Sequence, residues 1–319
     1  TIADTIKTTT GYFTGGDGTL AGTDIFTQSL GTKNQKYYYN VMHKDPASDN
    51  TAAVQFSVTF GHAAGSGSDT TGDSSGNNNT LNGESEAVYK QLTSLLLEET
   101  EASGGFKISA HQGGTGALGA GVRDDYVYVL VGKRERFKDR LNKKSWTLTL
   151  SGSSGSQAQD PLYLTDDSST VAGVATPGGP RYNIVSGALG VAKDPYTTRT
   201  YGWYYPEMGM MVFSGAELSH SIGGPGLAYQ SIQTVASVAY GTDQQLSSSG
   251  FTPYLTQDSN AKNALRLVAC MQNMQGVTSL RLRSEEDQTQ ENYFCRVRAT
   301  EYNFSSNPTF VSGSKNKIR

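Results

Sequence analysis

The stretch Val54–Phe60, VQFSVTF, alternates apolar and polar residues without a break. Its four apolar residues would fall on one side of an extended chain and its three polar residues on the other. A period of two predicts a β-strand with one buried face and one wet face. A second stretch, Tyr126–Val131 or YVYVLV, is apolar at every position, which predicts a central strand covered on both faces.

The composition agrees with a mostly β chain. The 319 residues include 37 Gly and 18 Tyr, with only 17% charged residues, a mixture that suits strands and turns better than helices. One helix is expected at residues 84–97, where Ala87, Leu92, Leu95 and Leu96 form an apolar stripe. We therefore expect antiparallel sheets in a sandwich-like arrangement, with one main helix and long Gly/Ser loops such as residues 61–83.

Further strands are expected along the rest of the chain, with a hairpin turn at residues 206–209 and a helical turn at Glu217–His220. The expected strands cover residues 37–42, 106–110, 145–150, 183–186, 201–205, 210–213, 231–240, 265–271, 277–283 and 293–300.

The chain divides by composition into four parts: an extended N-terminal arm at 1–30 that would dock on a partner, a β-rich domain with one helix at 31–150, a second β-rich domain at 160–300, and an extended polar tail at 301–319. The boundary between the two domains would be the SGSSGSQAQ segment at 151–159, although the strands on either side could share one sheet.

Charge is unevenly distributed. The net charge is −3, which disfavours general nucleic-acid binding. Lys133–Lys144 nevertheless holds seven basic and two acidic residues, a local sum of +5. This basic stretch has three interpretations: a solvated edge, a docking surface for an acidic patch on another subunit, or a contact with packaged genome. Its candidate interaction residues are Lys133, Arg134, Arg136, Lys138 and Arg140.

Two aromatic runs, Tyr37–Tyr39 and Trp203–Tyr205, add further candidates. In a strand, alternate side chains point to opposite faces, so some of these rings should face outward. Tyr37, Tyr39, Trp203 and Tyr205 could then contact another subunit or stack on a glycan, or they could serve sheet packing.

No catalytic, cofactor or metal site is expected. The four histidines are scattered without zinc-ligand spacing, and no phosphate-binding glycine motif occurs. Gly72–Gly76 matches the Gly-x-Ser-x-Gly string, but it lies in a low-complexity loop rather than between a strand and a helix. The paired acids at 124–125, 166–167 and 285–286 are sequence neighbours and suit turn and solvation roles. Cys270 and Cys295 are expected as buried thiols, with a disulfide as the alternative.

The C-terminal third carries a distinctive motif. Tyr293–Ala299, then Glu301–Phe310 (EYNFSSNPTF) and a Gly-Ser turn at Ser312–Ser314, resemble a stretch found in virion structural proteins of T-even-like myophages of cyanobacterial and marine type. The stretches 56–67, 126–137 and 203–215 are similar to such proteins too. The resemblance implies a particle protein with a tail or baseplate role, and no catalytic residues. It also implies that related chains continue past this motif, so Arg319 need not be a domain end.

We therefore expect a non-enzymatic structural component of a tailed-bacteriophage virion, assembled in the host bacterial cytoplasm, which docks other virion proteins in multiple copies as a homo- or hetero-oligomer. A receptor-binding or glycan-binding adhesin is the alternative, and a cell-wall hydrolase is a third. No apolar run of about 18 residues occurs, so no membrane span is expected.

Overall fold

The structure is a computed structural model, and it describes a little more than half of the chain in segments. These are residues 2–12, 20–21, 26–29, 38–42, 49–65, 83–108, 122–137, 139–150, 153–154, 157–158, 161–193, 199–221, 264, 267–268, 270–271, 278–293, 295–296, 311–312 and 317–318.

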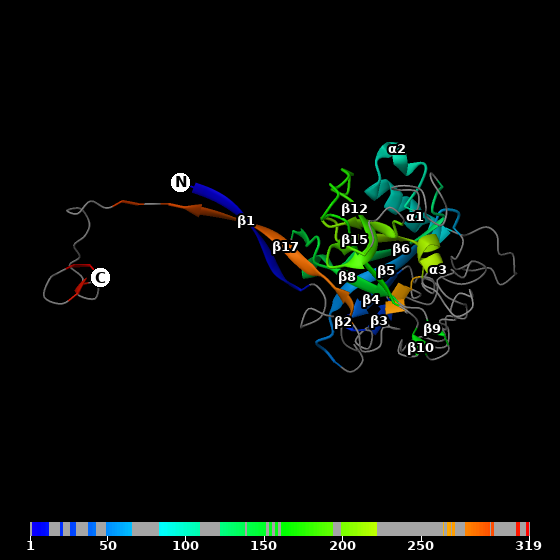
Figure 1. The fold of residues 1–319 in the computed structure, drawn as a ribbon, viewed down its shortest axis with the longest axis horizontal. Helices are drawn as coiled ribbons and strands as arrows, with labels where there is room; N and C mark the ends of the chain where they lie inside the picture. The colour runs from blue at the N-terminus through cyan, green and yellow to red at the C-terminus, as the bar shows by residue number, and fades with distance from the viewer. Residues whose placement is uncertain are drawn as a thin grey trace. The chain divides into compact units, whose positions relative to one another are not determined.

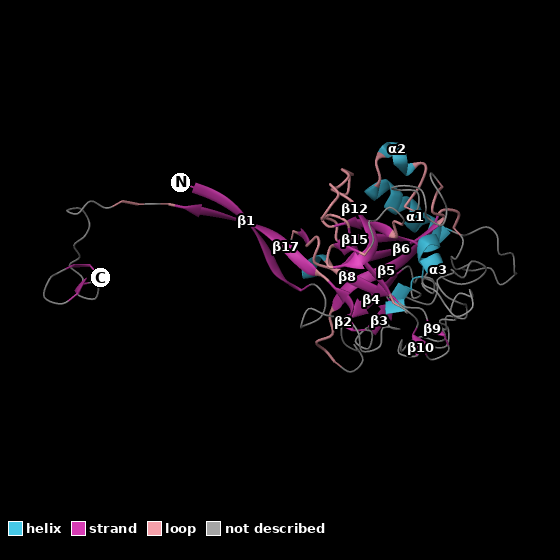
Figure 2. Ribbon diagram, in the orientation of Figure 1, coloured by secondary structure: helices cyan, strands magenta, loops and turns pink. Residues whose placement is uncertain are grey.

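Most of the described strands belong to one antiparallel sheet of twelve strands, so the expectation of a mostly β, antiparallel fold is confirmed (Figures 1 and 2). In spatial order the strands are β2 (Leu20–Ala21), β16 (Thr278–Arg281), β8 (Thr147–Leu150), β11 (Leu162–Asp166), β12 (Tyr182–Ala188), β14 (Gly202–Tyr205), β15 (Met210–Ser214), β6 (Tyr126–Gly132), β5 (Val54–His62), β4 (Tyr38–Met42) and β3 (Phe26–Ser29), with β13 (Val191–Ala192) paired to β12.

The sheet curls around its main apolar core. Val41 on β4 and Leu280 on β16 come from strands near opposite ends of the spatial order, yet both are fully buried in the same cluster. A flat sheet would hold these two strands far apart, so a shared core requires the sheet to curve toward itself.

Strand β6 is covered on both faces, as its sequence predicted. Tyr128 and Leu130 lie in the main core cluster, whereas Val127 and Val129 lie in a second cluster on the other face. Helix α1 (Gly83–Leu96) covers this second face, and the second cluster of buried side chains lies between the helix and the sheet (Figure 1). The helix approaches β5 closely at Gly61, where an added Cβ would lie 3.1 Å from the Tyr89 backbone.

The buried face of α1 differs from the expected stripe. Tyr89, Leu92 and Leu96 are buried against the sheet. Ala87 and Leu95, which were expected on that face, are exposed instead. A helix resting on one sheet buries only one narrow stripe, so residues at its border remain uncovered.

The expected helical turn is confirmed as α3 (Gly215–Ser221), and the hairpin at 206–209 is confirmed by the pairing of β14 with β15. Two further short helical elements in the described part of the chain are α2 (Glu99–Ala102) and a 3₁₀ turn at Arg134–Arg136.

The expected strand at 265–271 is wrong, because the described residues of this stretch are helical. The apolar positions Ala264, Leu267, Val268 and Met271 repeat at intervals of three and four, which is the period of a helix, and all four are buried in the main core.

Two other expected strands differ from the structure. Residues 106–108 have irregular backbone, with the Phe106 carbonyl accepting from the Asp124 N–H at 2.7 Å. The described residues Tyr293, Cys295 and Arg296 are not in a strand either. The expected strand at 231–240 lies outside the described residues.

The strands on either side of residues 151–159 pair directly, with Leu150 opposite Leu162. Strands from both expected β-rich domains thus form one sheet. The segment itself holds β9 (Ser153–Ser154) and β10 (Gln157–Ala158), which pair with each other. Within the expected N-terminal arm, β3 pairs with β4 of the same chain.

By its contacts the chain has two compact units, Thr9–Glu286 and a smaller one of Thr1–Thr8 with Asp287–Arg319. A three-stranded sheet has the order β1 (Ile2–Tyr12), β17 (Arg283–Asn292) and β7 (Arg140–Leu141). In the smaller unit, β18 (Val311–Ser312) pairs with β19 (Lys317–Ile318).

Candidate functional site

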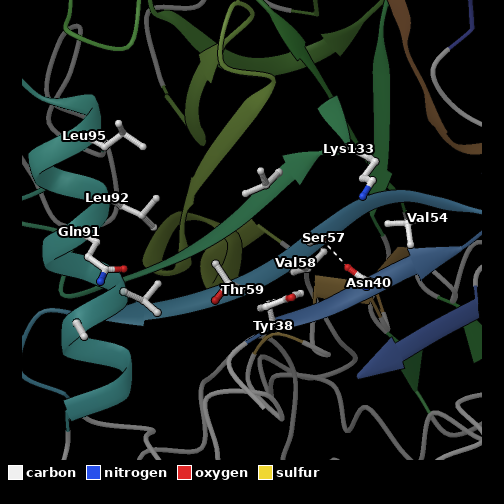
Figure 3. Close-up of a pocket in the computed structure, with 13 residues that line it drawn as sticks. Tyr38, Asn40, Val54, Ser57, Val58, Thr59, Gln91, Leu92, Leu95 and Lys133 are labelled. Carbon is white, nitrogen blue, oxygen red and sulfur yellow. Dashed lines mark hydrogen bonds between the residues drawn. The ribbon is translucent and has the colours of Figure 1, made fainter. Parts of the chain in front are cut away.

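A groove of about 730 Å³ lies beside helix α1, on the face of the sheet that the helix covers only in part (Figure 3). One wall is the side of α1, and the floor is formed by β4, β5 and the end of β6. The lining residues are Tyr38, Asn40, Val54, Ser57, Val58, Thr59, Ala87, Val88, Gln91, Leu92, Leu95, Val131 and Lys133.

Strand register explains the floor. Tyr38 pairs with Thr59 and Asn40 pairs with Ser57 across β4 and β5, so these side chains project from the same face. Ser57 Oγ donates a hydrogen bond to Asn40 Oδ1 at 2.7 Å. Ser57 and Thr59, two polar positions of the alternating stretch 54–60, therefore form with Asn40 a hydroxyl and amide floor beneath the groove.

The helix wall is apolar. Leu92 and Leu95 point from α1 toward the strands (Figure 3), and Leu95 is 45% exposed. Three consecutive leucines, Leu95–Leu97, cannot all face one side of a helix, because successive residues are about 100° apart. That run was the sequence signal for an outward leucine, and it was missed.

The described lining of the groove contains one charged side chain. Lys133 lies at its rim and is 3.8 Å from Glu135, with both side chains largely exposed, so this ion pair is weak. Among the residues that the structure describes, no carboxylate and no histidine line the groove.

The arginines of the basic stretch bind within the chain. Arg134 Nη1 donates to the Glu207 carbonyl at 3.0 Å and lies over the Phe137 ring. Arg136 Nη2 donates to Gln55 Oε1 at 3.0 Å.

Arg140 pairs with Glu285 at 2.6 Å and is largely buried. None of the three interpretations made from sequence included this intramolecular use. It depends on Gln55, Glu207 and Glu285, which lie between 73 and 145 residues away along the chain. Lys138 lies outside the described residues.

The aromatic candidates are used for packing. Trp203 is 3% exposed and Tyr205 is fully buried, both in the second core cluster. The expectation that alternate rings of this run face outward is wrong, because β14 is covered on both faces like β6. Tyr39 lies in β4 opposite Val58, and Tyr37 lies outside the described residues.

The Trp203 ring carries a buried ion pair on its face. The Arg181 guanidinium lies 4.0 Å from the ring centroid and binds both oxygens of Glu101, at 3.0 and 3.3 Å. Arg181 is 3% exposed, whereas the Glu101 side chain is 45% exposed. This cluster ties α2 to the sheet.

Several carboxylates are buried rather than solvated. Asp124 is fully buried, and its Oδ2 accepts from the Ile108 N–H at 2.6 Å while Oδ1 accepts from Ser214 Oγ. The Tyr89 hydroxyl donates to the Asp124 carbonyl at 2.7 Å and accepts from the Phe106 N–H at 3.0 Å. These bonds stabilise the irregular backbone before β6.

The pair Asp166 and Asp167 lies at the buried end of β11, directly before the turn at residues 168–170. Burial raises the pKa of both carboxyls, and hydrogen bonds from neighbouring groups oppose the rise. Asp167 accepts from the Asn183 N–H at 3.0 Å and from Asn183 Nδ2 at 2.8 Å. The expected turn role agrees with this geometry, but the expected solvation role is wrong for both.

Among the described residues, no group of three or more His, Cys, Asp or Glu is arranged to hold a metal ion. Cys270 is buried as expected, but Cys295 is exposed. No helix in the described part of the chain combines the length and apolarity needed to cross a bilayer. Comparison with known protein families, curated proteins and solved structures gives no match for this chain.

Proposed function

We propose that the chain is a structural component of a tailed-bacteriophage particle that acts by docking other protein subunits, with its place in the tail or baseplate. The groove beside α1 carries the proposal. It combines an apolar helix wall, a polar floor and a single cation, a pattern typical of protein contact surfaces, in which an apolar centre is bordered by polar groups.

The resemblance of the C-terminal motif at residues 293–314 to virion structural proteins supports the particle setting. The groove supports the docking role independently of that motif. Leu95 on α1 and Tyr38 on β4 both line the groove and are exposed. Together they offer apolar area that a partner can bury.

The described residues do not provide the features that would favour an adhesin or a cell-wall hydrolase. A glycan-binding adhesin would use an outward Trp203, but this ring is buried under Arg181. A glycoside-cleaving hydrolase requires two carboxylates facing across a cleft. The described lining of the groove offers none, and Asp166 and Asp167 lie next to each other at the buried end of β11.

The test places a photoreactive amino acid at Gln91, which is exposed on the groove side of α1. Ser94, exposed on the same helix but outside the groove, is the matched control position. Particles purified from lysed host cells are irradiated, and the products are identified by mass spectrometry. We expect crosslinks to virion polypeptides from position 91 and few from position 94. Absence of the chain from purified particles, or equal crosslinking from both positions, would contradict the proposal.

A further inference from the structure

The turn between β12 and β13 holds a leucine, Leu189, in a backbone conformation that leucine rarely adopts. Leu189 and Gly190 form a two-residue hairpin loop, and both have positive φ, 49° and 75°. Such a loop is a type I′ turn, whose first position favours Asn, Asp or Gly. Leucine in this left-handed conformation is strained. Its side chain is also 49% exposed, so burial compensates for the strain only in part.

The strained turn is held firmly. The Leu189 N–H donates to the Trp146 carbonyl at 3.2 Å and to Thr147 Oγ1 at 3.0 Å, and the Gly190 N–H donates to Thr165 Oγ1 at 2.8 Å. Backbone strain that persists because its surroundings fix it points to a functional use of the position. Val191, the next residue, is 70% exposed. The fold thus presents a rigid apolar tip, which we define as Gly187–Ala192.

The same chain carries a surface that suits this tip. The tip itself has no charge, and the groove beside α1 is apolar along its helix wall. Exposed Lys144 and Lys193 border the tip, and exposed Glu98 and Glu99 follow the groove residue Leu95 at the end of the helix. Lys133 lies on the strand side of the groove, directly after β6, so the lysines of the tip meet a like charge there and opposite charges only at the helix end. Apolar surfaces with opposite charges at their borders favour association and fix its orientation.

The tip cannot fill the groove of its own chain. Strands β14 and β15 separate β12 from β6, so β12 and β5 are four strand spacings apart along the sheet, which is about 19 Å at about 4.8 Å each. A tip and a groove at separate places on one molecule generate head-to-tail contacts, and repetition of that contact gives a ring or a filament.

We propose that the tip of one copy of this chain, with Leu189 and Val191, docks into the groove beside α1 of a second copy. This inference rests on the proposed docking function and names its partner. The contact is heterologous: each copy uses its tip to contact one neighbour and its groove to contact another.

The test mixes two complementary variants of the full chain. The tip variant combines Leu189→Asn with Val191→Ser, which keeps a favourable type I′ loop while removing the apolar side chains. The groove variant is Leu95→Lys, which keeps a good helix former but places a charge in the apolar wall. Val174→Asn, changing a side chain that is 42% exposed elsewhere, is the control.

Sedimentation velocity at about 100 μM gives distinct outcomes. We expect the wild type and the control to form dimers and larger species. Each variant alone should be monomeric, its association weakened at least about tenfold, the effect expected for loss of one buried anchor. An equimolar mixture of the two variants should form heterodimers and nothing larger, because it contains one intact tip and one intact groove per pair.

A monomeric wild type, or a mixture that stays monomeric, would overturn the head-to-tail contact. The crosslinking at Gln91 separates this failure from failure of the proposed function. Crosslinks to a different virion polypeptide with a monomeric wild type would remove only the self-association. Loss of both results would remove the docking role itself.

Discussion

Replacing Glu101 by Gln should destabilise the chain by about 2 kcal/mol. The Arg181 guanidinium is almost fully buried against Trp203, and both of its terminal nitrogens bind Glu101. Breaking a fully buried ion pair costs about 3–5 kcal/mol, whereas an exposed pair contributes about 0–1 kcal/mol. Because the Glu101 side chain is 45% exposed, and Gln keeps one acceptor oxygen, the expected loss lies between these limits.

The assay is urea unfolding followed by tryptophan fluorescence, with Trp203 lying directly under the guanidinium as a reporter. Glu99→Gln provides a matched control. Glu99 lies on the same short helix, is exposed and has no ion pair among the described residues, and the change in net charge is identical.

We expect Glu101→Gln to lower the unfolding midpoint clearly and Glu99→Gln to leave it within about 0.5 kcal/mol of wild type, as is usual for a surface change. In 0.5 M salt the difference should shrink only in part, because the guanidinium is buried while the Glu101 side chain is 45% exposed. Equal midpoints for the two variants would refute the view that this pair anchors α2 to the sheet.

Three further changes test other parts of the structure. Burial lowers the pKa of His62, so as the pH falls the unfolded chain binds a proton near pH 6.5 before the folded chain does. The free energy of unfolding should therefore decrease as the pH drops below 6.5. His62→Gln should reduce this pH dependence of the urea midpoint. Gly209→Ala should lower the free energy of unfolding by more than about 2 kcal/mol in thermal unfolding, because φ is +68° and the new Cβ would lie 2.3 Å from Phe137 Cζ. Gly104→Ala is the control and should cost less, because its Cβ would meet only a flexible side chain at 3.3 Å and a carbonyl at 3.5 Å. Tyr89→Phe should cost about 2 kcal/mol in the same assay, because it leaves a buried carbonyl and a buried N–H without their hydroxyl partner.

The groove results from how one helix is placed on a wide sheet. Helix α1 covers Val127 and Val129 of β6 but leaves the polar positions of β4 and β5 beside it open. A helix is about 10 Å across and spans about two strands. A sheet of this width therefore keeps an uncovered region next to its single long described helix, and a partner chain can occupy that region.

The basic stretch shows why composition misleads about surfaces. Its local charge of +5 suggested a docking patch, yet Arg134, Arg136 and Arg140 each bind a distant group of the same chain. Of the described residues of this stretch, only Lys133 borders the groove. Charge that is clustered in sequence can be dispersed in space, because each long side chain follows the nearest acceptor that folding supplies.

Local periodicity determined the strand class, the position of α1 and the two-sided burial of β6, and the turn residues at 206–209 determined the hairpin. These features depend on the alternation of side chains along a short segment, which the sequence contains in full. The sequence also contained the signal for the missed helix near Leu267, because its apolar residues repeat at intervals of three and four.

Tertiary structure alone decided which surfaces remained open. The burial of Trp203, the exposure of Leu95, the partners of Arg181 and the separation of the Leu189 tip from the groove all depend on segments far apart in the chain. Burial is a property of what another segment covers, and no local pattern contains that information.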